Sequence, residues 1–133
     1  TKYQEVFMKR FTAIVIVSAA VAFSSTPAFA DSVINSFNCK LKDGKTTEDV
    51  HATNSKWLKW VHANVNEKIT SSVGTAIVGD TDMFLFIDTY PDLNTWAATQ
   101  TALDSDAADE LDNLFEDVTD CSQNRLWKVE PTP

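Results

Sequence analysis

The segment Met83–Tyr90 constrains the fold more than any other part of the chain. It reads Met-Phe-Leu-Phe-Ile-Asp-Thr-Tyr, and side chains alternate between the two faces of a strand. One face would carry methionine, leucine and isoleucine, while the other would carry two phenylalanines and tyrosine. Helices of the same chain can cover one face of such a strand, so we expect a second copy of the chain to cover the other.

Three features near the N-terminus are typical of a secretory signal peptide. Met8 is followed by two basic residues, by an apolar run over residues 11–23, and by a small-residue cleavage site that ends at Ala30. The run is shorter than the roughly 20 residues that span a bilayer, so we expect cleavage rather than a membrane anchor. Residues 1–7 would be upstream read-through, residues 8–30 the signal peptide and residues 31–133 a single domain. The domain is then expected to be exported, either periplasmic or secreted.

The charge of residues 31–133 argues against two classes of partner. This part of the chain has eight basic and eighteen acidic side chains, so its net charge is about −10. Such a charge repels nucleic acid and anionic membranes, and we expect neither as a partner. The acidic run over residues 104–120 lacks the glycine and glutamate spacing of a calcium loop. We interpret this run as a solvated helix face.

Both cysteines, Cys39 and Cys121, lie in the part expected to be exported. A pair of cysteines in an oxidising compartment is typical of a disulfide. A zinc site would need further cysteine or histidine ligands nearby, and the sequence offers none. His51 and His62 would lie three turns apart on one helix, too far to share an ion. We therefore expect a Cys39–Cys121 disulfide and no metal.

The hydrophobic spacing predicts the remaining elements. Strands are expected at residues 33–41, 71–79, 83–90 and 121–130, with helices at 47–68, 93–103 and 107–118. Strand, helix, strand, strand, helix pair, strand is the α+β ferredoxin-like arrangement, βαββαβ, with an antiparallel four-stranded sheet and helices on one face. Its first and last strands are neighbours, which would bring Cys39 and Cys121 together.

Polar residues at buried positions are the candidates for a site. Asn54 falls within the apolar stripe of the helix at 47–68 and must find a hydrogen bond there. His62 lies at the edge of that stripe and is interpreted as a boundary residue. Asp88 interrupts an apolar face of the central strand, where a carboxylate must be paired or reach water. Arg125 is the expected partner of Asp88, either in a structural ion pair, which we favour, or at the mouth of a pocket.

The sequence resembles the dimeric α/β-barrel superfamily, which includes antibiotic-biosynthesis-type monooxygenases, haem-degrading monooxygenases and NIPSNAP-like proteins. The resemblance rests on the turn at 43–46, on Asn54-Ser55-Lys56-Trp57, on the strand at 83–90, and on Tyr90-Pro91-Asp92 followed by Trp96. It covers all of residues 31–133. It implies a homodimer whose two sheets pack face to face, with a pocket between sheet and helices in each subunit.

The resemblance also implies site residues. Asn38 and Trp96 are similar to an asparagine on the first strand and a tryptophan in the second helical region of the haem-degrading members. The iron-ligating histidine of those members would follow Trp96, and this chain has none there, so no haem or other cofactor is expected. The cofactor-independent oxygenases, in which the substrate supplies the electrons, are similar to this chain through the same asparagine and tryptophan. An oxygenase of that kind would use Asn38 and Trp96, together with His62 or Tyr90.

Three functions follow from the sequence. The first is an exported dimeric protein that binds a small apolar or aromatic ligand, and the second is a cofactor-independent monooxygenase. The third is a structural or interaction domain without a ligand. The residues expected to line the ligand site are Asn38, Asn54, His62, Asp88, Tyr90, Trp96 and Arg125. A hollow space between sheet and helices would favour the first two functions, and a filled one the third.

Overall fold

The computed structural model of this chain describes residues 32–132. The elements are β1 Ser32–Leu41, α1 Thr47–Asn64, β2 Thr70–Thr75, β3 Met83–Tyr90, α2 Leu93–Leu103, the 3₁₀ turn η1 Asp106–Ala108, α3 Asp109–Val118 and β4 Thr119–Val129. The predicted signal peptide at residues 8–30 and the preceding residues 1–7 lie outside the described part. None of the helices within residues 32–132 combines the length and apolar character that crossing a bilayer requires.

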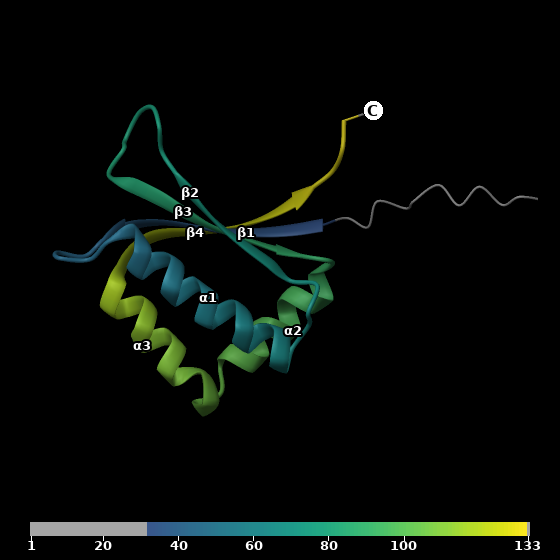
Figure 1. Cartoon of the computed structure of the whole chain (residues 1–133). Coiled ribbons are helices and arrows are strands. Elements are labelled where there is room, and N and C mark those ends of the chain that lie inside the picture. The colour runs from purple at the N-terminus through teal and green to yellow at the C-terminus, as the bar shows by residue number, and fades with distance from the viewer. Residues whose placement is uncertain (1–31, 133) are drawn as a thin grey trace, which may run out of the picture.

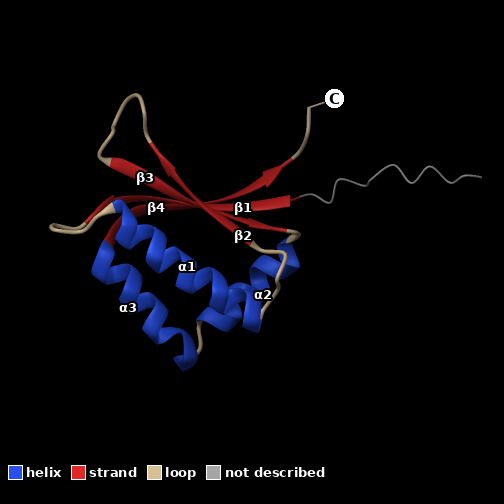
Figure 2. Ribbon diagram, viewed as in Figure 1, coloured by secondary structure: helices blue, strands red, loops and turns tan. Residues whose placement is uncertain are grey.

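The strands form one antiparallel sheet in the order β2-β3-β1-β4, with the helices packed against one face (Figures 1 and 2). This is the βαββαβ topology predicted from the sequence. The first and last strands are neighbours, and Cys39 lies opposite Cys121 beside an irregularity in the β1–β4 register. The predicted Cys39–Cys121 disulfide is present.

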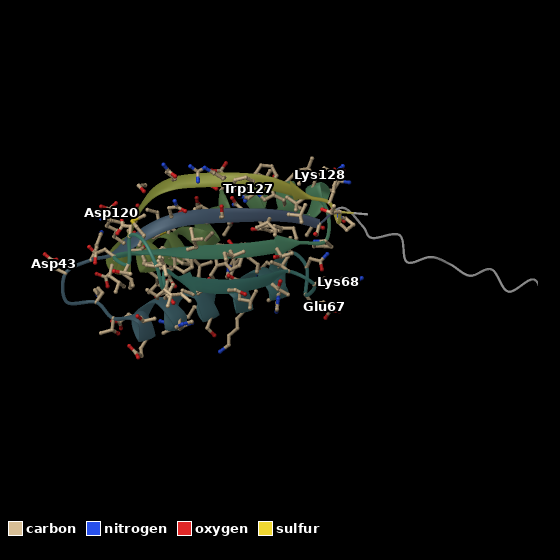
Figure 3. The ribbon with its side chains drawn as sticks, turned by 90° about the horizontal axis from the view of Figure 1, so that it is seen from above. Asp43, Glu67, Lys68, Asp120, Trp127 and Lys128 are labelled. Carbon is tan, nitrogen blue, oxygen red and sulfur yellow. A yellow bond between two sulfur atoms is a disulfide. The ribbon has the colours of Figure 1, made fainter. Side chains whose placement is uncertain are left out.

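The two faces of β3 have the predicted alternation. Phe84, Phe86, Asp88 and Tyr90 are buried beneath the helices. The residues between them point to the other side of the sheet and are half-buried. We call that side the open face, and Figure 3 looks onto it. Its apolar residues are Ile34, Met83, Leu85, Ile87, Trp127 and Val129.

Helix α1 begins as predicted but ends earlier. The Thr46 side chain accepts a hydrogen bond from the Asp49 amide, and the Asp49 carboxylate accepts one from the Thr46 amide, which forms a capping box. Past Asn64 the chain turns, because the Asn66 side chain accepts a hydrogen bond from the Lys68 amide. Ile69, predicted on the helical stripe, is instead fully buried at the entrance to β2.

Strand β2 is shorter than the predicted strand at 71–79. Residues 76–82 form a loop in which Gly79 has φ +91°, a conformation that favours glycine, and Asp80 accepts a hydrogen bond from the Asp82 amide. Ile77 and Val78 are therefore outside the ladder and are 94% and 91% exposed. The loop rises on the side of the sheet opposite the helices (Figure 1).

Candidate functional site

A pocket of about 490 Å³ lies between the sheet and the helices. Strands β1, β3 and β4, the residues that connect them to the helices, and helices α1, α2 and α3 all contribute to it. The lining residues are Asn35, Phe37, Lys42, Asn54, Trp57, Phe86, Asp88, Tyr90, Gln100, Leu103, Asp112, Phe115, Glu116, Thr119, Asp120 and Cys121. The sequence analysis left open whether the space between sheet and helices is hollow or filled, and in the structure it is hollow.

A row of polar side chains crosses the sheet at the floor of this pocket. Ser71 on β2 and Asn35 on β1 are both paired with Asp88 on β3, so the three share one face. The Ser71 hydroxyl donates to Asp88 Oδ1 over 2.5 Å, and Asn54 Nδ2 donates to the Ser71 hydroxyl oxygen over 2.9 Å. Asn54, on α1, thereby finds the hydrogen bond that its buried position requires.

Asn35 has an unsatisfied hydrogen-bond acceptor in this row. Its side chain lines the pocket and is 2% exposed, and Oδ1 has no hydrogen-bond partner within residues 32–132. Buried polar atoms are almost always paired, so an orphan acceptor on a residue that lines a cavity indicates a position where a bound molecule can donate. Asn35 was missed as a site residue. Its place on the same strand face as the buried Val33 and Cys39 was the signal that could have found it.

Asp88 is the ionisable group at the floor. Burial raises the pKa of its carboxyl to about 6, and the hydrogen bond from Ser71 acts in the opposite direction. No basic side chain of the described residues contributes to that pKa. Burial, followed by the Asp88 charge, also raises the pKa of the neighbouring Tyr90 hydroxyl, which therefore stays neutral at physiological pH.

Aromatic rings form much of the wall. Phe86 on β3 and Phe115 on α3 meet edge to face, with their centroids 5.3 Å apart and their planes at 86°. Trp57 from α1, Tyr90 and Phe37 complete the aromatic lining. The pocket opens where its lining is exposed, at Lys42, Gln100, Asp112, Glu116 and Asp120. The Lys42 ammonium group there donates to the backbone carbonyl of Glu116.

Solved structures with this architecture come from diverse organisms. SnoaB, a cofactor-independent oxygenase from Streptomyces nogalater, superposes with a TM-score of 0.54 at 11% identity, covering 77% of this chain and 97% of its own. A hydroxynitrile lyase from Passiflora edulis has the same TM-score, identity and coverages. A NIPSNAP-like domain protein from Burkholderia xenovorans gives 0.52 at 10% identity, covering 77% and 87%. No family model and no curated protein sequence matches the chain.

The chain has the ferredoxin-like fold of these proteins. The resemblance to monooxygenases of the antibiotic-biosynthesis type and to NIPSNAP-like proteins is thereby confirmed at the level of the fold. At identities this low, the activity of those proteins cannot be assigned to this chain, so the site has to be judged on its own residues.

The ferredoxin-like fold brings three of the seven predicted site residues together, one from α1 and two from β3. Asn54, Asp88 and Tyr90 all line the pocket. Asn38 does not, because its place in β1 puts it on the open face, where Nδ2 donates to Gln123 Oε1 over 3.3 Å. Arg125 lies opposite Ser36 on that same open face. The predicted Asp88–Arg125 ion pair is therefore wrong, since the sheet separates the two side chains.

Two further predicted residues lie elsewhere in the ferredoxin-like fold. His62 is exposed, and its Nε2 is 2.6 Å from the carbonyl oxygen of Ile69, so it belongs to the helix boundary as its pattern indicated. Trp96 on α2 packs against the core outside the pocket, and its buried Nε1 has no hydrogen-bond partner among the described residues. Within residues 32–132, no three His, Cys, Asp or Glu side chains are grouped so as to hold a metal ion.

Proposed function

We propose that the chain is an exported, homodimeric protein that binds a small apolar or aromatic ligand between its sheet and its helices. The observation that supports this is the hollow of about 490 Å³ with aromatic walls and the unpaired Asn35 acceptor on its floor. Ligand sites in proteins are concave, mostly apolar and equipped with a few placed polar groups. A purely structural domain gains nothing from leaving a buried acceptor unsatisfied beside a cavity.

The open face supports the homodimer. At its centre, Leu85 and Ile87 are only half-buried, and Trp127 on β4 is 48% exposed with its Nε1 donating to the Ser36 hydroxyl oxygen over 2.8 Å (Figure 3). The loop at 76–82 and the end of β4 rise beyond this face (Figure 1). An exposed sheet face with apolar side chains at its centre is a typical protein interface, and a second copy offers the same face to cover it.

A cofactor-independent oxygenase is the second candidate. It is favoured by Asp88, because a buried carboxyl whose pKa is about 6 can accept a proton from a phenolic or quinol substrate near neutral pH. Oxygen uptake with a panel of phenols and quinols tests this. Uptake that is lost in Asp88→Asn with the fold intact would make the protein an enzyme, and absence of turnover across the panel would leave it a binder.

Ligand binding is tested by intrinsic tryptophan fluorescence, since Trp57 lines the pocket. One- and two-ring aromatic compounds should change the emission saturably in the wild type. Leu103→Trp puts bulk into the pocket and should abolish this response, whereas Leu93→Trp, at an exposed position of the same helix, should not. Equal binding by the two variants would place the ligand elsewhere and overturn the proposal.

The homodimer is tested by sedimentation velocity. Leu85→Lys sets a charge at the centre of the open face and should convert a dimer to a monomer. Leu93→Lys makes the same substitution at an exposed helix position and should leave the dimer intact. A wild-type chain that sediments as a monomer throughout the micromolar range would contradict the proposed assembly.

A further inference from the structure

The charges of the pocket point to a ligand class narrower than the one proposed above. Asp88, Asp112, Glu116 and Asp120 are carboxylates in its lining, and Lys42 is its single basic residue. The Lys42 ammonium group is already bound to the backbone carbonyl of Glu116. The pocket therefore has a negative potential, and residues 31–133, with a net charge of about −10, attract cations from solution.

At the floor, the missing partner has to be a donor. Asp88 is 5% exposed and receives one hydrogen bond, from the Ser71 hydroxyl. Asn35, directly opposite on β1, contributes a buried Oδ1 without a partner. A neutral hydroxyl would satisfy Asn35 but leave the charge of Asp88 uncompensated. An N–H cation supplies both the donor and the charge, and a buried carboxylate is costly without a counter-charge.

The walls are suited to the same kind of group. Phe86 and Tyr90 lie two residues to either side of Asp88 on the same face of β3, each about 7 Å along the strand. Trp57 from α1 lines the same pocket, and Phe115 packs edge to face against Phe86. Aromatic faces around a carboxylate attract organic cations, because the negative faces of the rings add to the charge of the carboxylate.

We propose that the ligand is a small organic cation, namely an aromatic ring that carries a protonated amine on a short arm. This inference rests on the ligand pocket proposed above. The ammonium group lies between Asp88 and Asn35, and the ring lies among Trp57, Phe86 and Phe115. An anionic ligand such as a carboxylate is repelled. A metal ion is not the expected ligand, since within residues 32–132 no three His, Cys, Asp or Glu side chains are grouped so as to hold one.

Three probes that share one ring and one two-atom arm test the proposal by isothermal titration calorimetry. They are 2-phenylethylamine, 2-phenylethanol and phenylacetate. At pH 7 the amine should bind at least about tenfold more tightly than the alcohol, which corresponds to one ion pair reinforced by ring contacts. Phenylacetate should bind more weakly than either. Leu103→Trp should weaken all three, because it fills the pocket.

Asp88→Asn is the decisive variant. The ratio of amine to alcohol affinity should fall to about one, while the alcohol itself binds about as in the wild type. Asp80→Asn removes an exposed carboxylate in the loop at 76–82 and should leave the ratio unchanged. Circular dichroism and thermal unfolding establish that both variants are folded.

A second measurement is made on the wild type, so that it does not depend on whether Asp88→Asn folds. Lowering the pH from 7 to 5 should reduce the amine preference, because Asp88 becomes protonated while the amine stays charged. The other ionisable groups that line the pocket are Tyr90, on the same strand as Asp88, and Lys42, Asp112, Glu116 and Asp120. The residues that α1 and β2 place around Asp88 are Asn54, Trp57 and Ser71, none of which is ionisable. Any pH dependence that persists in Asp88→Asn belongs to the carboxylates at the mouth.

The outcomes separate this inference from the proposed function. Equal affinity for the amine and the alcohol, or preference for phenylacetate, would overturn the cation preference and leave the ligand pocket standing. Binding of none of the three probes, together with no fluorescence response to other aromatic compounds, would overturn the pocket as well. An amine preference that survives Asp88→Asn unchanged would show that the cation lies elsewhere, and it too would overturn the inference.

Discussion

Asn35 on β1 and Asp88 on β3 are directly paired across two antiparallel strands, and both side chains are buried on the helix-covered side of the sheet. No side-chain hydrogen bond joins the two, and Asn35 Oδ1 has no partner within residues 32–132. A cavity of about 490 Å³ lies over the pair. A bound molecule that donates a hydrogen bond to this acceptor would therefore stabilise the folded protein.

Asp88 should make the stability of the empty protein depend on pH. Its folded pKa, about 6, lies above the ordinary value of 3.8, so the folded state binds the proton more tightly than the unfolded state does. The free energy of unfolding therefore falls as the pH rises from about 4 through about 6, and the whole effect is about 3 kcal/mol. Urea unfolding at several pH values measures it.

Asp88→Asn is the control for that titration, since it removes the ionisable group and keeps a side chain of the same shape. The variant should be less stable than or equal to the wild type near pH 4 and gain relative to it by up to about 3 kcal/mol at pH 7. A difference between the two proteins that does not change with pH would mean that Asp88 keeps its ordinary pKa in the fold.

The disulfide should contribute strongly to stability. Cys39 and Cys121 are 82 residues apart, and a cross-link over a loop of that length is worth about 4 kcal/mol in the chain-entropy model. Replacing both cysteines by alanine should lower the unfolding free energy by that order. The wild type in a reducing agent should match the double variant, and an unfolding midpoint insensitive to the reducing agent would argue against the bond.

The first turn of α1 should depend on Thr46. Its side chain accepts a hydrogen bond from the Asp49 amide, so Thr46→Ala should cost about 1 kcal/mol of stability. Thr47→Ala, one position further and exposed, makes the same substitution without losing that cap and should change stability by less than about 0.5 kcal/mol. Equal losses in denaturant unfolding would mean that the capping box contributes nothing.

Much of the fold could be predicted from the sequence, because its strongest signals are local. The two-faced strand at 83–90, the turn chemistry around it and the helical spacing after Asp92 were enough to order the elements. The Cys39–Cys121 pairing then agreed with the order of the strands. The ends of elements were predicted less well. Ile69 and Ile77 fit the periodic patterns, but side-chain hydrogen bonds in the following turns end α1 and β2 before them.

The site was predicted less completely than the fold, for a reason of geometry. Asn38 and Asn35 lie on opposite faces of β1, and the choice of Asn38 followed a resemblance instead of the alternation around the buried Val33 and Cys39. Arg125 was chosen by its charge alone, although its strand face was still unknown. Asn54, Asp88 and Tyr90 were found because each is a polar or partly polar group that the apolar pattern itself places inside.

The position of a bound molecule tests the account most directly. Nuclear Overhauser effects between unlabelled 2-phenylethylamine or 2-phenylethanol and the labelled protein report which side chains the ring contacts. The account predicts contacts to Trp57, Leu103 and Phe115, around the pocket beneath the helices. Contacts confined to Leu85, Ile87 and Trp127 on the open face would contradict it.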